Sequence, residues 1–261
     1  EAYKKVAIAL NGKPVIIRTL DIGGDKEIPY MGLEKDENPF LGYRAIRLCL
    51  DRKEDIYKPQ LRALLRASAY GNIRIMIPLV TCIDELREAK ALIEEIKAEL
   101  DEKNIAYKKD IQVGIMVETA AASLIADIFA KEADFFSIGT NDLTQYTMSV
   151  DRGNKKVSYL YSTFNPAVLR SIRHIIACGR EAGIMVGMCG EAASDPMMIP
   201  LLLAFGLNEF SMSASAILRA RKMVTEYSVE ALQAVADKAM SFATTAEVED
   251  YMRKFVEKIT G

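Results

Sequence analysis

Side chains that can bind an ion or move a proton stand directly after several short apolar runs of the chain. They are Arg18, Glu118, Asn141, Asp142 and Cys189. If the runs are parallel strands, their carboxyl ends meet at one edge of a sheet or barrel, and these side chains share that edge. Any one of them alone fits a solvated loop or an ion pair, but their common position at strand ends predicts a single site.

Two carboxylates of this set suit a divalent cation. Glu118 and Asp142 are 24 residues apart, which is the length of one strand–helix unit. Adjacent strands would bring both carboxylates to one rim, with room for water and substrate oxygens. Mg²⁺ prefers such hard oxygen ligands and keeps several of its waters. The alternative is a pair of loop carboxylates bridged by a lysine.

Three arginines, Arg18, Arg44 and Arg152, are the candidate anion ligands. A guanidinium binds phosphate or carboxylate through two hydrogen bonds and stays charged. Arg18 directly ends an apolar run, and Arg44 lies in a turn that leads into a predicted helix. The Gly-Gly-Asp-Lys loop that ends at Lys26 offers backbone amides and a lysine to a phosphate.

The thiol of Cys189 is the candidate proton donor or acceptor, because it ends an apolar run where a barrel opens. The other cysteines lack the paired spacing of a metal site and are expected in the core or in helices. His174, the single histidine, falls within a helical pattern away from every strand end. We therefore interpret His174 as a structural or surface residue.

The composition excludes several classes of protein. Of the 261 residues, 50% are apolar and 27% are charged, which is typical of a globular protein and excludes disorder. With 34 basic and 36 acidic residues the net charge is −2, so the overall charge of the protein does not attract nucleic acid or an anionic membrane surface. No apolar stretch approaches the roughly 20 residues that cross a bilayer. Widely spaced cysteines indicate a reduced, cytoplasmic compartment.

The elements that must position these residues alternate along the chain. Six short apolar runs are separated by helical patterns, and they cover residues 15–17, 73–77, 113–117, 135–138, 185–188 and 209–212. Strand followed by helix, repeated, predicts an α/β fold, namely a (β/α)₈ TIM barrel that forms one domain over residues 1–261. A doubly wound sheet is the alternative, which the lack of a glycine-rich fingerprint after the first run disfavours.

Several local signals predict where helices begin. Asn165 precedes a first-turn proline, and Thr244 with Glu247 fits a capping box. Pro200 is expected in an early helical turn. From about Ser228 the chain reads as a terminal layer of helices. The late helices, including the apolar stretch 201–203, are candidates for a surface between two copies of the chain.

Longer segments of the chain resemble a known family. Residues 134–145 (Asp-Phe-Phe-Ser-Ile-Gly-Thr-Asn-Asp-Leu-Thr-Gln) resemble the signature of the phosphoenolpyruvate-utilising enzymes. The same family is matched by segments 18–26, 38–44, 114–119 and 187–191. Together these segments are similar to enzyme I of the bacterial sugar phosphotransferase system, the phosphoenolpyruvate–protein phosphotransferases. The alternatives are phosphoenolpyruvate synthase, pyruvate phosphate dikinase, a Mg²⁺-dependent enolate lyase, and a binding or dimerisation module without chemistry.

The resemblance implies roles for residues that bind phosphate and metal. Arg18 and Arg44 would hold the phosphate of phosphoenolpyruvate, with Lys26 nearby. Glu118 and Asp142 would bind Mg²⁺. Such a set agrees with phosphoryl transfer, which depends on positioning and charge stabilisation.

The resemblance also implies how pyruvate forms. Asn141 and Arg152 would contact the phosphate and carboxylate end of the substrate, together with Asp142. Cys189 would protonate the enolate carbon to give pyruvate. The implied partners are an N-terminal phosphohistidine domain, the small phosphocarrier protein that it serves, and a second copy of the chain in a homodimer.

Two departures from the family limit this expectation. The family's phosphate-accepting histidine lies in a separate N-terminal region, and His174 does not match it. The family's barrel begins with a strand that bears a further phosphate-binding arginine, so this chain is expected to lack the first strand. Seven strand positions are then expected at most, one of them in segment 38–44. The fragment alone is expected to bind phosphoenolpyruvate at most weakly, and it is not expected to complete the reaction or to phosphorylate itself.

Overall fold

The computed structural model describes residues 1–23, 32 and 36–260, and it divides the chain into two compact units. The first unit is Glu1–Met116 and the second is Val117–Gly261. The prediction of one domain over residues 1–261 stays a prediction. Lys26 lies outside the described residues.

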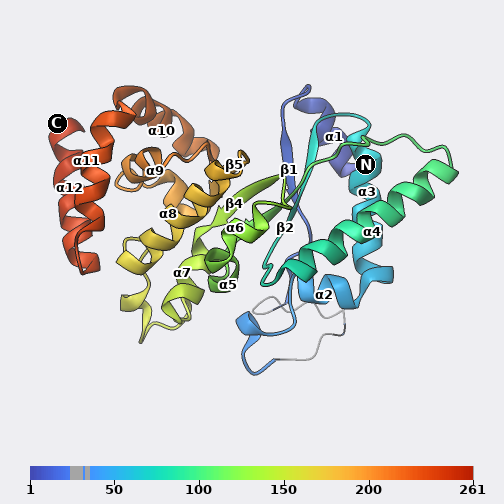
Figure 1. The fold of residues 1–261 in the computed structure, drawn as a ribbon, viewed down its shortest axis with the longest axis horizontal. Coiled ribbons are helices and arrows are strands. Elements are labelled where there is room, and N and C mark those ends of the chain that lie inside the picture. Colours follow the sequence, from blue (N-terminus) through green and yellow to red (C-terminus); the bar gives the residue numbers. More distant parts are fainter. Residues whose placement is uncertain (24–31, 33–35, 261) are drawn as a thin grey trace. The chain divides into compact units, whose positions relative to one another are not determined.

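The first unit contains three parallel strands with helices between them (Figure 1). Val15 pairs with Ile73, and Ile75 pairs with Val113, so the strand order follows the chain. The elements of this unit are α1 (Ala2–Ala9), β1 (Val15–Arg18), the 3₁₀ turn η2 (Pro39–Leu41), α2 (Ile46–Asp51), the π turn η3 (Lys53–Tyr57), α3 (Lys58–Ser68), β2 (Ile73–Ile77), α4 (Ile83–Glu102) and β3 (Val113–Val117).

The second unit contains β4, β5 and β6, which are also parallel and in chain order. Phe135 pairs with Met185, and Gly187 pairs with Glu209. The elements are α5 (Ala120–Leu124), α6 (Ala126–Phe129), β4 (Phe135–Gly139), α7 (Thr140–Met148), η4 (Ser158–Leu160), α8 (Pro166–Glu181), β5 (Met185–Cys189), η5 (Glu191–Ser194), α9 (Ile199–Phe205), β6 (Glu209–Phe210), α10 (Ala214–Glu226), α11 (Val229–Met240) and α12 (Thr245–Thr260).

The predicted α/β fold of the TIM-barrel type is confirmed, in an incomplete form with six parallel strands among the described residues. All five residues of β3 and of β4 are buried, as expected for strands of a parallel sheet that is covered on both faces. The strand expected in segment 38–44 is absent. Residues 39–41 form the turn η2 instead, where Pro39 offers no N–H to a neighbouring strand.

The helix starts follow their sequence signals. The Asn165 side chain accepts a hydrogen bond from the Ala167 amide at 2.9 Å, and Pro200 lies in the first turn of α9. Glu247 accepts hydrogen bonds from the Thr244 amide at 3.0 Å and from its hydroxyl at 2.8 Å. These contacts confirm the predicted cap before α8 and the capping box before α12.

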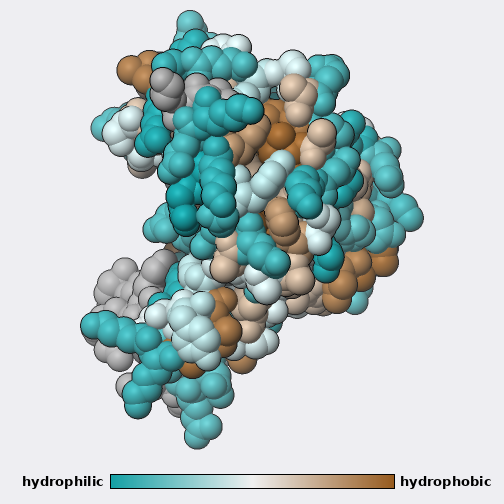
Figure 2. All heavy atoms as spheres, turned by 90° about the vertical axis from the view of Figure 1, so that its left-hand side faces the viewer, coloured by the Kyte–Doolittle hydropathy of each residue, from teal (hydrophilic) through white to brown (hydrophobic). Residues whose placement is uncertain are grey.

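Stretch 201–203 does not form a surface for a second copy. Leu201 and Leu202 are fully buried, and Leu203 packs on a core cluster that includes Ile199 and Met223. Helix α9 is therefore part of the core of the second unit. A view of the side of the molecule that carries α10–α12 in Figure 1 shows a mostly hydrophilic surface with apolar patches (Figure 2). Within the described part of the chain, no helix has the length and apolar character needed to span a membrane.

Candidate functional site

Arg18 and Arg44, the two predicted phosphate ligands, meet at the carboxylate of Asp21 in the first unit. Arg18 Nη1 lies 3.2 Å from Asp21 Oδ2. Arg44 Nη2 and Nε donate to the other oxygen, Oδ1, at 2.8 and 3.3 Å. Two of the predicted residues are thus brought together by an acid that the sequence analysis did not single out.

The backbone around Gly23 sets the position of Arg44. Arg18 is the last residue of β1, and five residues later Gly23 packs against the segment that precedes α2. A Cβ on Gly23 would lie 2.7 Å from the carbonyl oxygen of Tyr43 and 2.8 Å from the Arg44 Cβ, and its φ is +100°. Only glycine fits this approach without strain. The Ala45 amide donates to the Ile22 carbonyl at 3.3 Å, which fixes the same contact.

The burial of this cluster is uneven. The side chains of Asp21 and Arg44 are 5% and 7% exposed, whereas that of Arg18 is 41% exposed. Buried charges need an opposite charge or hydrogen-bond partners, and Asp21 supplies both to Arg44. These three side chains together carry one net positive charge. The cluster can therefore attract an anion from the side on which Arg18 meets solvent.

Two buried carboxylates lie in the second unit. Glu118 directly follows β3 and is 2% exposed, and Asp142 lies in the first turn of α7 and is 6% exposed. Helix α5, which begins just after Glu118, packs against α7. Asp142 Oδ1 accepts a hydrogen bond from Arg152 Nη1 at 2.8 Å. The amide of Arg152 in turn donates to Gln145 Oε1 at 3.1 Å.

The oxygens of these two carboxylates are of the type that binds Mg²⁺. Mg²⁺ is usually held by one or two carboxylates, with waters and substrate oxygens completing its shell. Across the residues that the structure describes, no cluster of three or more His, Cys, Asp or Glu side chains is placed to bind a metal. A Mg²⁺ ion held by Glu118 and Asp142 would therefore depend on water and substrate for its remaining ligands.

Tyr161 joins the group around Asp142 and was not predicted from the sequence. Its hydroxyl donates to the carbonyl oxygen of Asn141 at 3.2 Å. Burial raises the pKa of the Tyr161 hydroxyl, the nearby Arg152 opposes this shift, and the charges of Glu191 and Asp142 add to it. Tyr161 follows the short turn η4, twenty residues after Asn141, where no periodic pattern marks a contact.

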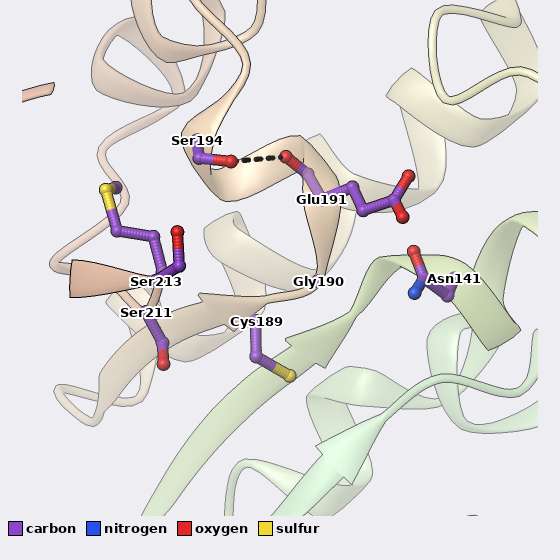
Figure 3. Close-up of a pocket in the computed structure, with 8 residues that line it drawn as sticks. Asn141, Cys189, Gly190, Glu191, Ser194, Ser211 and Ser213 are labelled. Atoms are coloured by element: carbon purple, nitrogen blue, oxygen red, sulfur yellow. Dashed lines mark hydrogen bonds between the residues drawn. The ribbon is translucent and has the colours of Figure 1, made fainter. Parts of the chain in front are cut away.

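Cys189 lines a pocket of about 390 Å³ in the second unit. Its Sγ donates to the carbonyl oxygen of Ile138 at 3.7 Å, and the Thr140 hydroxyl donates to the carbonyl oxygen of Cys189 at 3.2 Å. Figure 3 shows the carboxylate of Glu191 pointing toward the side chain of Asn141 across the pocket. The lining residues are Asn141, Cys189, Gly190, Glu191, Ser194, Ser211, Met212 and Ser213.

The remaining predictions have mixed outcomes. His174 lies within α8, is exposed, and contacts Cys178 Sγ at 3.6 Å through Nε2, which agrees with a structural or surface role. The predicted anion ligands Arg18 and Arg44 belong to the first unit, and the other described site residues belong to the second. The prediction that all of them form one site stays a prediction.

Comparison with known proteins assigns the family. Residues 1–229 match the family model described as "PEP-utilising enzyme, PEP-binding domain", where PEP is phosphoenolpyruvate. The chain belongs to this family. The resemblance deduced from the sequence motifs is thereby confirmed.

The relatives narrow the family further. The chain is 52% identical over 252 residues to the phosphoenolpyruvate-protein phosphotransferase of Priestia megaterium, 54% over 253 residues to that of Geobacillus stearothermophilus, and 53% over 254 residues to that of Bacillus subtilis. Each match covers 97% of this chain and 44% of the relative. The chain is thus homologous to a transferase and spans less than half the length of these relatives.

A solved structure is also similar in part. A citrate lyase from Burkholderia xenovorans LB400 matches with a TM-score of 0.48 and 20% identity, covering 76% of this chain and 68% of that one.

Proposed function

We propose that this chain is the phosphoenolpyruvate-binding part of a phosphoenolpyruvate–protein phosphotransferase. It binds phosphoenolpyruvate with Mg²⁺, and the phosphoryl group passes to a histidine in another domain of the protein, with release of pyruvate. This is the first step of sugar uptake by the phosphotransferase system. The match of residues 1–229 to a phosphoenolpyruvate-binding domain carries the proposal.

Arg18 and Arg44 are proposed to bind the phosphate, with Lys26 as a further cation. Their guanidiniums offer planar donor pairs that match phosphate oxygens. In the structure, both guanidiniums contact the carboxylate of Asp21. The phosphate–oxygen bond of the substrate breaks while these donors stabilise charge on the phosphoryl oxygens.

Glu118 and Asp142 are the proposed ligands of Mg²⁺. When bound, the ion would neutralise negative charge on the phosphate and on the enolate oxygen. Arg152 holds the Asp142 carboxylate through Oδ1. Asn141 and Arg152 are proposed to contact the phosphate and carboxylate end of the substrate.

Cys189 is the proposed proton donor. Departure of the phosphoryl group leaves an enolate, whose terminal carbon takes the proton of the Cys189 thiol and becomes the methyl group of pyruvate. The thiolate regains a proton from solvent before the next turnover. The contact of Sγ with the Ile138 carbonyl restrains the thiol within the pocket that it lines.

The proposal includes the partners implied by the family. The phosphate acceptor is a histidine of an N-terminal domain, which serves a small phosphocarrier protein. The protein is proposed to act in the cytoplasm as a homodimer. His174, which lies on α8 beside Cys178, is not proposed as an acceptor, because the family's acceptor histidine lies in a separate N-terminal region.

Titration calorimetry with phosphoenolpyruvate in the presence of Mg²⁺ tests the proposal. Wild-type chain is expected to bind, and Glu118→Gln is expected to weaken binding at least about ten-fold, because loss of a carboxylate weakens a metal site. Binding of Mn²⁺ as a paramagnetic substitute should weaken in parallel.

Glu257→Gln, which alters an exposed carboxylate on α12, is the control and should bind like wild type. If wild-type chain does not bind phosphoenolpyruvate, the proposed function is wrong. If it binds and Glu118→Gln binds equally well, the assignment of the metal ligand is wrong.

A further inference from the structure

Asp21 is the one member of the arginine cluster without an assigned role. We propose that Asp21 is a positioning residue, whose carboxylate holds the guanidiniums of Arg18 and Arg44 in the orientation that binds the substrate phosphate. The inference rests on the proposed function, because it concerns the same substrate.

The contacts of Asp21 divide between its two oxygens. Oδ2 lies 3.2 Å from Arg18 Nη1, and Oδ1 accepts hydrogen bonds from Arg44 Nη2 and Nε at 2.8 and 3.3 Å. One carboxylate therefore fixes the separation of two cations that would otherwise repel each other. The two donors that converge on Oδ1 also restrain the plane of the Arg44 guanidinium, which matters for a planar ligand of phosphate.

Burial separates the role of Asp21 from that of the arginines. Its side chain is 5% exposed, compared with 41% for Arg18. A carboxylate repels a phosphate, so Asp21 is no ligand of the substrate. It acts through Arg18 and Arg44.

A positioning role and a charge-compensating role predict opposite results. If Asp21 only neutralised charge, its removal would raise the positive potential at Arg18 and Arg44 and strengthen the binding of any anion. If Asp21 positions the guanidiniums, its removal weakens the binding of phosphoenolpyruvate despite the more positive charge. The direction of the change in affinity therefore distinguishes the two roles.

The experiment compares Asp21→Asn with wild type in the full chain, by titration calorimetry with phosphoenolpyruvate and Mg²⁺. Asp21→Asn keeps the size of the side chain but removes its charge. We expect affinity to fall roughly 10- to 100-fold, the usual effect of losing hydrogen bonds to a charged group. Unchanged or tighter binding would overturn the inference.

Asp55→Asn is the matched control. It removes a carboxylate that also pairs with an arginine of the first unit, Arg52, but at the surface. Its affinity for phosphoenolpyruvate should stay within about two-fold of wild type, since exposed pairs contribute little. A loss in Asp55→Asn equal to that in Asp21→Asn would show a general effect of charge and overturn the inference.

A double-mutant cycle with Arg44→Lys provides a measurement that a merely structural role would not affect. If Asp21 acts through the arginines, the loss of affinity in the double variant is smaller than the sum of the losses in the two single variants. Strictly additive losses would contradict the proposal.

Asp21→Glu covers the case in which Asp21→Asn does not fold. It keeps the charge but moves the carboxylate by one methylene, and weaker binding is again expected. Wild-type affinity in Asp21→Glu would overturn the inference. Unfolding of both variants, measured by circular dichroism, would assign Asp21 to stability and overturn it as well. If wild type itself binds no phosphoenolpyruvate, the proposed function is wrong. If wild type binds and the Asp21 variants bind equally well, only the inference about Asp21 is wrong.

Discussion

Cys189 is the residue on which formation of pyruvate depends in the proposed reaction. Its thiol is restrained from the backbone of β4 by the Ile138 carbonyl, while its own carbonyl accepts from Thr140. The proton donor therefore has a position that does not depend on bound substrate. A thiol held in this way can deliver a proton to a carbon atom only if that carbon is brought within reach of Sγ.

Cys189→Ala should slow proton transfer without weakening binding. We expect exchange of the pyruvate methyl protons with deuterated water, followed by NMR in the presence of Mg²⁺, to slow at least about 100-fold. Affinity for phosphoenolpyruvate should stay within about two-fold, because the thiol contacts carbon rather than a charged group. Cys82→Ser, at an exposed position before α4, is the control. Wild-type exchange in Cys189→Ala would exclude the thiol as the donor.

Single residues of the site differ in how far the sequence predicts them. Arg18 and Cys189 are predictable because each ends an apolar run, and the structure places both at strand ends. Asp21 and Tyr161 are not, because their contacts depend on irregular backbone after β1 and before α8. An acid three residues after Arg18 is the signal that was available for Asp21.

At the scale of elements, the predicted strands and helix starts were the most accurate part of the sequence analysis. Short apolar runs, β-branched or rich in Met and Phe, predicted β1 to β5 within a residue. The pattern was clearest for β3 and β4, which are buried along their whole length. The last run was predicted over 209–212, but β6 ends at Phe210. The prediction of a strand in segment 38–44 was wrong. Tyr43 and Arg44 pack against Gly23, and the next residue, Ala45, hydrogen-bonds to Ile22, and no local sequence pattern encodes these contacts.

The capping box of α12 gives a pH-dependent contribution to stability. Hydrogen bonds from the Thr244 hydroxyl and amide lower the pKa of Glu247 below its usual value of 4.5. Because the pKa of Glu247 is lower in the folded state than in the unfolded state, its carboxylate stabilises the protein at a pH above the unfolded-state pKa. This stabilisation is lost as the pH falls through the folded-state pKa.

Glu247→Gln should therefore lower the Tm at pH 7, and the difference from wild type should shrink as the pH falls below 4.5 and vanish below the lowered pKa of Glu247 in the folded state. Thermal unfolding followed by circular dichroism across this pH range measures the effect. Glu230→Gln, in the first turn of α11, is the control for helix-dipole effects. A difference that persists unchanged in acid would contradict the assigned cause.

At the scale of the whole molecule, the sequence predicts a homodimer but not its surface. Stretch 201–203 is not available as a surface between two copies, because Leu201 and Leu202 lie in the core. Helix α10 instead carries exposed apolar side chains, with Ile217 42%, Leu218 78% and Val224 40% exposed. Hydrophobic periodicity alone does not separate a core face from a surface between copies, which is why the sequence analysis could name the late helices only as candidates.

Leu218→Glu should shift a dimer toward the monomer, because a charge in an apolar interface loses its hydration. Sedimentation velocity at micromolar concentration is the measurement, with wild type expected to be dimeric. Leu124→Glu, at a position of α5 that is 77% exposed, is the matched control and should stay dimeric. A monomeric wild type would refute the predicted dimer, and a dimeric Leu218→Glu would exclude α10 as its surface.

The two hydrogen bonds that hold Cys189 connect the proposed proton donor to the segment that carries a proposed metal ligand. Ile138 and Thr140 restrain the cysteine, and Asp142 lies two residues beyond Thr140, in the first turn of the same helix. The thiol at the end of β5 is therefore hydrogen-bonded to the same short segment of backbone that carries the Asp142 carboxylate. A substitution that displaces residues 138–140 should consequently disturb the proton donor and the proposed metal ligand together.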